Sequence, residues 1–194
     1  PFANAYRYRD YVIAAFNKDK PFARFVQELV AGDLLPAGDA EVEADRLTGP
    51  GALLLGPYIL NSELDAAADQ IGMLTRALVG IDVSCSRCHD HPIEPLTTED
   101  FYGLAGIFKS TRTMKQIVDK RGKGDGYWLE REITLAALGS AKPVVESVMC
   151  VEEGSPKNLR IHIRGSHLEL GEEVRRGLPK ILSRQVAAAG IGPG

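Results

Sequence analysis

The sequence CSRCHDHPIEPLTTEDFYGLAGIF, residues 85–108, combines a compact cysteine and histidine motif with a strong helical signal. A helix is predicted over Thr97–Phe108, because Thr97 or Thr98 can cap its first turn and apolar side chains then recur at helical spacing. Glu99 and Asp100 favour the same start, since their charge complements the positive end of the helix dipole. This segment therefore predicts a helical domain.

Three further helices are predicted from apolar residues at i, i+3, i+4 and i+7 spacing. They span Asn4–Asn17, the stretch from Pro21 to a stop at Gly32, and Glu63–Leu78. The last of these has Asn61 or Ser62 as its cap and ends at Gly80. Between them, Leu34–Gly51 holds two prolines and three glycines and is predicted to be a loop.

The second part of the chain has a different pattern. Residues 120–126, KRGKGDG, are typical of a linker. Strands are predicted over Val144–Val151 and Leu159–Arg164, joined as a hairpin by a turn at Gly154–Pro156. We therefore expect an α+β chain with a helical domain at 1–120, a linker at 121–130, a small β-containing segment at 131–186 and a disordered tail at 187–194.

Cys85, Cys88 and His89 form a C-x-x-C-H motif, which is the arrangement that attaches a c-type haem. Two thiols one helical turn apart can add to the two vinyl groups of haem, and the adjacent imidazole reaches the iron from the same side. The motif therefore predicts a mainly α haem-binding domain, with haem c as the cofactor and His89 as an iron ligand.

Two other chemistries are compatible with C-x-x-C. A closed zinc site usually needs a second Cys or His pair, and the other candidates, His91, Cys150, His162 and His167, offer no such pair. A thioredoxin-like dithiol would follow a strand of a βαβ unit, whereas helices are predicted before this motif. A zinc site and a redox-active dithiol therefore remain the alternatives to a haem site.

The second axial position of the iron can hold Met, His or no protein ligand. Met114 is the favoured candidate, because it follows the helix after the motif and a loop there can fold back over the haem. His167 and His162 are its rivals, although His162 is expected to face solvent from a strand. His91 is too close to His89 to reach the opposite face of the haem.

The chain also resembles a planctomycete cytochrome-like domain family that has long been described as a domain of unknown function. The matching runs are Tyr8–Val12, Phe16–Phe22, Phe25–Asp33, Cys85–Pro92, Thr98–Tyr102, Gly106–Met114, Ile163–Gly165 and Gly171–Val174. The resemblance implies a large, exported, multidomain protein whose C-x-x-C-H motif binds haem.

Composition limits the possible partners. The net charge is −3 and the pI is about 5.9, which does not favour nucleic acid as the main partner. No apolar stretch is long enough to span a bilayer, and three cysteines do not make a disulfide framework. A start at Pro1 rather than Met is expected of a fragment or a processed product.

These features together predict a c-type cytochrome module for one-electron transfer or redox sensing, exported to the periplasm or beyond. Its expected partners are a redox protein or fused domains. A basic run could attract an acidic partner or simply be a solvated surface; it comprises Lys109, Arg112, Lys115, Lys120, Arg121 and Lys123. The alternatives are a haem enzyme with an open sixth position and a structural module stabilised by haem.

Overall fold

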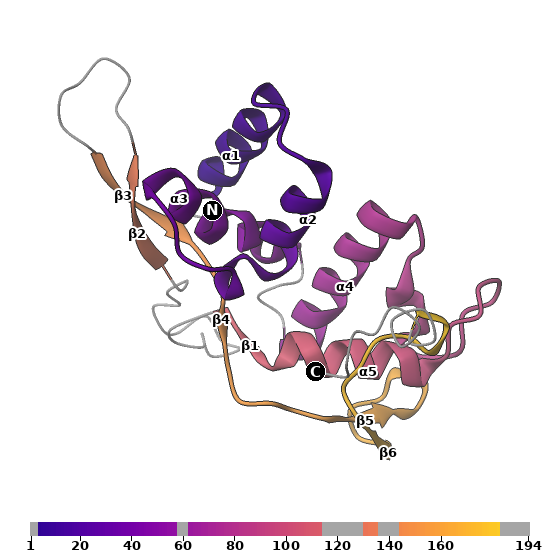
Figure 1. Cartoon of the computed structure of the whole chain (residues 1–194). Helices are drawn as coiled ribbons and strands as arrows, with labels where there is room; N and C mark the ends of the chain where they lie inside the picture. Colours follow the sequence, from indigo (N-terminus) through magenta and orange to yellow (C-terminus); the bar gives the residue numbers. More distant parts are fainter. Residues whose placement is uncertain (1–3, 58–61, 114–129, 136–143, 183–194) are drawn as a thin grey trace. The chain divides into compact units, whose positions relative to one another are not determined.

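The computed structural model of the protein describes residues 4–57, 62–113, 130–135 and 144–182, with side chains described in 4–57, 62–113 and 147–182. The chain forms two compact units (Figure 1). Unit 1 comprises Pro1–Leu55 and Arg112–Glu153, and unit 2 comprises Gly56–Thr111 and Gly154–Gly194. Each unit joins helices from the first part of the chain to strands from the second. The sequence had suggested consecutive segments instead.

Unit 1 begins with the two helices predicted there. Helix α1 spans Ala5–Asn17 and α2 spans Phe22–Ala31. Tyr11 of α1 and Phe25 of α2 stack with ring centroids 5.7 Å apart, so their apolar sides face each other. Helix α2 passes directly into the short 3₁₀ helix η1 (Gly32–Leu34).

The prediction of a loop over Leu34–Gly51 is wrong. Helix α3 spans Ala40–Thr48, and the 3₁₀ helix η2 spans Gly49–Leu54. The side chain of Asp39 caps α3 by accepting hydrogen bonds from the backbone N–H groups of Glu41 and Val42, each at 3.0 Å. A capped start and acidic residues in the first turn are enough to form a helix here.

Glycines beside and within this segment permit close packing. A Cβ at Gly32 would lie 2.1 Å from the backbone oxygen of Arg46, and one at Gly49 would lie 2.6 Å from that of Glu28. Any larger residue would push these elements apart, so the glycines hold η1 against α3 and η2 against α2. Every residue of η2 is buried accordingly.

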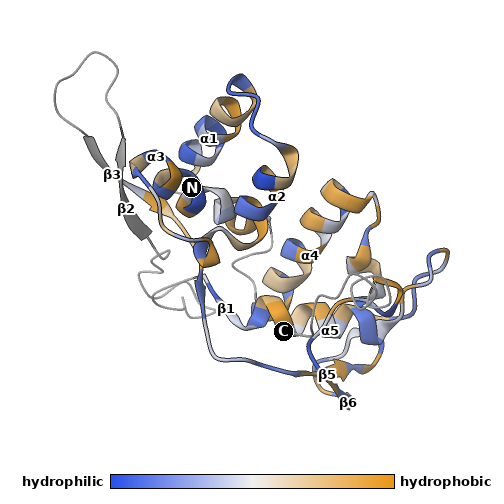
Figure 2. Cartoon of the chain, viewed as in Figure 1, coloured by the Kyte–Doolittle hydropathy of each residue, from blue (hydrophilic) through white to orange (hydrophobic). Residues whose placement is uncertain are grey.

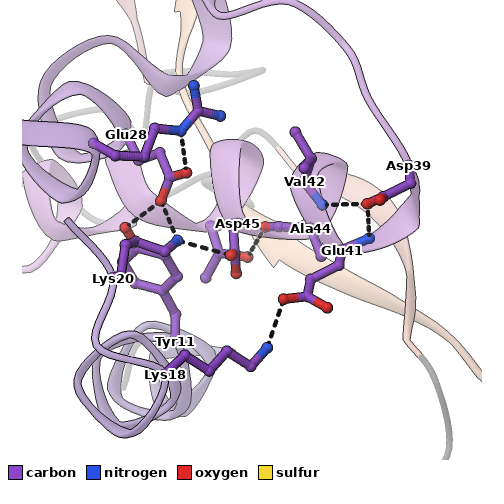
Figure 3. Close-up of polar contacts among 11 residues, drawn as sticks. Tyr11, Lys18, Lys20, Glu28, Asp39, Glu41, Val42, Ala44 and Asp45 are labelled. Carbon is purple, nitrogen blue, oxygen red and sulfur yellow. Dashed lines mark hydrogen bonds and ion pairs between the residues drawn. The ribbon is translucent and has the colours of Figure 1, made fainter.

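A buried ion network connects the helices of unit 1 (Figure 3). Glu28 is only 2% exposed. Its carboxylate accepts hydrogen bonds from the Tyr11 hydroxyl at 2.8 Å, from Arg24 Nε at 2.7 Å and from the Lys20 ammonium group. Lys20 also donates to Asp45 at 2.7 Å. The network thus links α1, α2 and α3 through fully paired charges.

The strand predicted over Val144–Val151 is β3 (Val144–Met149), but its predicted hairpin partner is wrong. It pairs antiparallel with β2 (Glu130–Leu135), with Glu130 opposite Met149 and Leu135 opposite Val144. β1 (Thr111–Arg112) pairs with β4 (Glu152–Glu153). The predicted turn Gly154–Pro156 therefore lies between two separate sheets, after β4 and before β5.

Unit 2 contains the other two predicted helices. Helix α4 spans Glu63–Val79; Ser62 caps its first turn and Gly80, in the left-handed conformation at φ 74°, ends it. Helix α5 spans Thr98–Lys109. Thr97 and Asp100 form a capping box, in which each side chain accepts a hydrogen bond from the other residue's backbone N–H. The predicted caps Ser62 and Thr97 are confirmed.

The core of unit 2 lies between α4 and α5, whose hydrophobic residues are orange in Figure 2. Its fully buried members include Ile71, Phe101 and Tyr102. Strands β5 (Leu159–His162) and β6 (Leu170–Val174) pair antiparallel and add Leu159, Ile161 and Val174 to this core. The late segment is therefore an integral part of unit 2.

The α+β class is confirmed, because helices are accompanied by small antiparallel sheets. The predicted linker at 121–130 falls almost wholly outside the described residues, and the predicted tail at 187–194 falls fully outside them. Within the described ranges, no helix is both long and apolar enough to cross a bilayer.

Candidate functional site

The Cys–His motif lies on the 3₁₀ helix η3 (Val83–Arg87) and the residue that ends it, Cys88. The Asp82 side chain caps η3 by accepting a hydrogen bond from the backbone N–H of Ser84 at 3.1 Å. Val83 is buried in the core of unit 2. One end of the motif is thus fixed to the α4–α5 pair.

The tight winding of η3 brings the two thiols to one side. A 3₁₀ helix has three residues per turn, so residues i and i+3 eclipse each other. Cys85 and Cys88 have this spacing, and both are exposed, free cysteines. Ser86, between them, is fully buried. The motif therefore contains two exposed, free cysteines three residues apart.

An ion pair connects η3 to the start of α4. Arg87 Nη1 lies 2.6 Å from Asp65 Oδ1, with both side chains partly buried at 28% exposure. Asp65 belongs to the capped first turn of α4. The Arg87 side chain therefore restrains the turn that carries Cys88.

His89 follows Cys88 directly and is exposed. Its Nδ1 lies 2.7 Å from the backbone oxygen of Asp90. A carbonyl oxygen only accepts hydrogen bonds, so Nδ1 is the donor, and the tautomer that makes this bond has its lone pair on Nε2. This tautomer leaves Nε2 as a metal-binding atom, with the ring oriented by the backbone.

The turn after the motif is organised by His91 and Asp90. His91 Nδ1 accepts hydrogen bonds from the backbone N–H groups of Ile93 at 3.3 Å and Glu94 at 2.9 Å. Asp90 Oδ1 accepts from the backbone N–H of Thr98 at 2.8 Å. His91 is thus used in shaping the turn that leads from the motif into α5.

The structure places the three candidates for the second iron ligand in different surroundings or leaves them undescribed. Met114 lies outside the described residues. His167 is exposed. The expectation that His162 faces solvent is wrong: its ring lies 5.8 Å from that of Tyr102, and its Nδ1 is buried. A register shift in the β5–β6 pairing lies between Arg160 and His162, at the end of β5.

The surroundings of His162 also determine its charge. Burial, followed by the nearby positive charges of Arg87 and His167, lowers the pKa of His162 below its ordinary value. These surroundings therefore favour the neutral form of the His162 imidazole. Burial likewise raises the pKa of Tyr102, whose ring packs against His162.

Two members of the predicted basic run form ion pairs within the chain. Lys109 pairs with Glu63 and Arg112 pairs with Glu152. Burial and the nearby charge of Lys157 lower the pKa of Lys109 to about 8. Lys115, Lys120, Arg121 and Lys123 lie outside the described residues.

Cys150 is a buried, free cysteine at 1% exposure. Across the described part of the chain, no three His, Cys, Asp or Glu residues gather as a metal-binding group.

Sequence reasoning missed one neighbour of the motif. Gly165, in the connection between β5 and β6, lies against Cys88, and a Cβ at this glycine would be 2.6 Å from Cys88 Sγ. Its only sequence signal is its presence in the run Ile163–Gly165 that resembles the cytochrome-like family. The contact joins residues that are distant in the chain and could not be predicted from local pattern.

Comparison with known proteins gives one match. The model of the PSCyt2 family, described as a protein of unknown function (DUF1549), matches residues 1–113. No curated protein matches the chain. No solved structure matches it either. Since the family match covers more than half of the 194 residues, the protein belongs to the PSCyt2 (DUF1549) family.

Proposed function

We propose that this protein is a c-type cytochrome module that binds one haem covalently and serves one-electron transfer or redox sensing. Cys85 and Cys88 are the attachment residues and His89 is an iron ligand. The module acts within a larger exported protein, together with a redox partner or fused domains. Its membership of the PSCyt2 family is compatible with this function but does not establish it.

One observation carries the proposal: Cys85 in η3 and Cys88 at its end are exposed, free cysteines, and they are followed directly by a histidine whose Nδ1 lies against a backbone carbonyl. Each Cys S–H can add across one vinyl group, forming a C–S and a C–H bond and releasing nothing. Reduced thiols are required, and both are free here. The donor set and its exposure therefore fit a haem c.

Apolar side chains near the motif support the same ligand. Ile93, in the turn after His89, is 85% exposed, and Leu168, after the Gly165 turn, is 81% exposed. Ile163 and Leu170 are also exposed, at 44% and 46%. A flat apolar macrocycle bound at the motif would reduce the cost of leaving such side chains in water.

The protein would tune the site through its own groups. A bound haem iron supplies reversible exchange between the ferric and ferrous states. The Asp90 carbonyl orients the His89 ring, and the Arg87–Asp65 ion pair restrains the turn beside it. Met114 remains our proposed second ligand, because it comes shortly after α5 in the chain, just beyond the short strand β1.

Optical spectra test this proposal. The wild-type protein, produced with haem-maturation machinery, is expected to give a low-spin c-type spectrum when reduced. The oxidised form is expected to show the weak long-wavelength band of sulfur–iron coordination. Met114→Ala should abolish that band and allow carbon monoxide or cyanide to bind the iron, because it opens the sixth position.

Each other spectroscopic result would lead to a different conclusion about the ligand or the function. Wild-type protein that already binds these ligands would exclude Met114 and favour the haem-enzyme alternative. Loss of the low-spin spectrum in His167→Ala or His162→Ala, with Met114→Ala unchanged, would assign the ligand to the second part of the chain. A wild-type protein without any haem spectrum would contradict the function itself.

A further inference from the structure

The connection between β5 and β6 has an unusual backbone. The 3₁₀ turn η4 (Ile163–Gly165) contains two consecutive left-handed residues, Arg164 at φ 52° and Gly165 at φ 77°. Backbone hydrogen bonds from Ile163 to Glu169 at 2.9 Å and from Ser166 to Ile163 at 3.0 Å hold this shape. A non-glycine residue is rarely left-handed, so Arg164 is kept there by its surroundings.

The turn is directed at the thiol of Cys88. A Cβ at Gly165 would approach Cys88 Sγ to 2.6 Å, which no ordinary contact permits. Two other glycines provide a comparison. Gly80 has nearly the same φ, 74°, but open space around it, and Gly171 on β6 would place its Cβ at an ordinary 3.5 Å from Ile161. Among the glycines that the structure describes, Gly165 alone combines a left-handed backbone with contact to the motif.

The two residues before the turn pack against the core of unit 2. Ile161, just before it, packs against the core of unit 2, and His162 packs on the buried Tyr102 ring. The Nδ1 atom of His162 is buried without a hydrogen-bond partner among the described residues. Such an unsatisfied polar atom is costly and marks a place where a bound group can be accommodated.

We propose that the turn Ile163–Ser166 forms part of the haem site and that Gly165 positions the Cys88 sulfur for its thioether. This inference rests on the proposed function. It assigns a haem-contact element beyond residues 1–113, the part that the family match covers. A side chain at 165 would compete for the volume that Cys88 Sγ and its new carbon bond need.

The test compares Gly165→Ala with Gly80→Ala, which is matched for backbone strain, and with Gly171→Ala in the same hairpin. Each full-length protein is produced with haem-maturation machinery, and haem peptides are assigned by mass spectrometry. In Gly165→Ala we expect the fraction of chains with a thioether at Cys88 to fall about fivefold. Attachment at Cys85 should be retained, and both control variants should match wild type.

A double variant separates crowding from a general loss of structure. In a Cys88→Ala background, haem is attached through Cys85 alone and the sulfur that meets residue 165 is absent. Adding Gly165→Ala to Cys88→Ala should therefore cost no more attachment than Gly80→Ala does in that background. An equal loss in both backgrounds would show that the turn matters only for folding and would overturn the inference.

Failure of this inference is distinguishable from failure of the proposed function. If wild type carries haem while Gly165→Ala resembles Gly80→Ala, the inference is wrong and the cytochrome proposal stands. If wild type carries no haem, both are wrong. Alkylation of haem-free protein with N-ethylmaleimide checks the contact directly: Gly165→Ala should slow modification of Cys88 relative to Cys85, and an unchanged ratio would contradict it.

Discussion

Glu28→Ala is expected to lower the free energy of unfolding by about 3–5 kcal/mol, because it removes one partner from a buried ion network. Lys20, whose side chain is 11% exposed, would lose one of its two carboxylates, and the Tyr11 hydroxyl would lose its acceptor. Denaturation in urea, followed by circular dichroism, measures this change. The loss should exceed that of any surface ion pair in the same unit.

The matched control is Glu41→Ala. Glu41 pairs with Lys18 at 2.7 Å, but the two side chains are 65% and 54% exposed (Figure 3). Exposed pairs contribute about 0–1 kcal/mol, so this variant should be close to wild type. Equal effects of the two substitutions would show that the Glu28 network contributes no more than a surface pair.

The pH dependence of the Glu28 effect has a defined sign. Burial alone would raise the pKa of Glu28, but hydrogen bonds from Lys20, Tyr11 and Arg24 outweigh it and hold the pKa below its ordinary value of 4.5. A depressed folded-state pKa adds stability above the unfolded-state pKa, and this stability is lost as the pH falls through the folded value. The difference between wild type and Glu28→Ala should therefore shrink in acid.

Cys85→Ser combined with Cys88→Ser is expected to abolish covalent haem retention. No sulfur at the motif would then be able to form a thioether, although His89 could still bind iron reversibly. Each single variant should keep haem through one remaining bond. Haem staining of denaturing gels measures retention for all three proteins.

Cys150→Ala is the control for this series. Cys150 is the remaining cysteine and is buried at 1% exposure in the other unit. The substitution should reduce stability but leave haem on the denatured chain. Haem that stays bound in the double motif variant, or that is lost in Cys150→Ala, would place the attachment elsewhere.

The features that the sequence predicts correctly are determined by residues that lie close together in the chain. Helices α1, α2, α4 and α5 were visible because their apolar spacing and caps, such as Ser62 and Thr97, are local. The motif Cys85–His89 was visible for the same reason, since its chemistry needs adjacent residues.

The incorrect predictions concern features that depend on tertiary packing. Gly49 suggests a loop by its residue type, but it permits a backbone contact with Glu28 that sequence spacing does not reveal. The partner of β3 was misassigned because strand pairing depends on an earlier strand at Glu130–Leu135. His162 is expected to face solvent from strand alternation, but it lies at the end of β5 and packs against Tyr102. The contact of Gly165 with Cys88 is likewise invisible to any local pattern.

The central claim is that the thiols of Cys85 and Cys88 carry a covalent haem, and intact mass spectrometry tests it most directly. The wild-type chain should be purified under denaturing conditions from cells with active haem maturation. We predict the polypeptide mass plus one haem, with peptide fragments that place both thioether bonds on Cys85 and Cys88. A bare polypeptide mass from those cells would contradict the account.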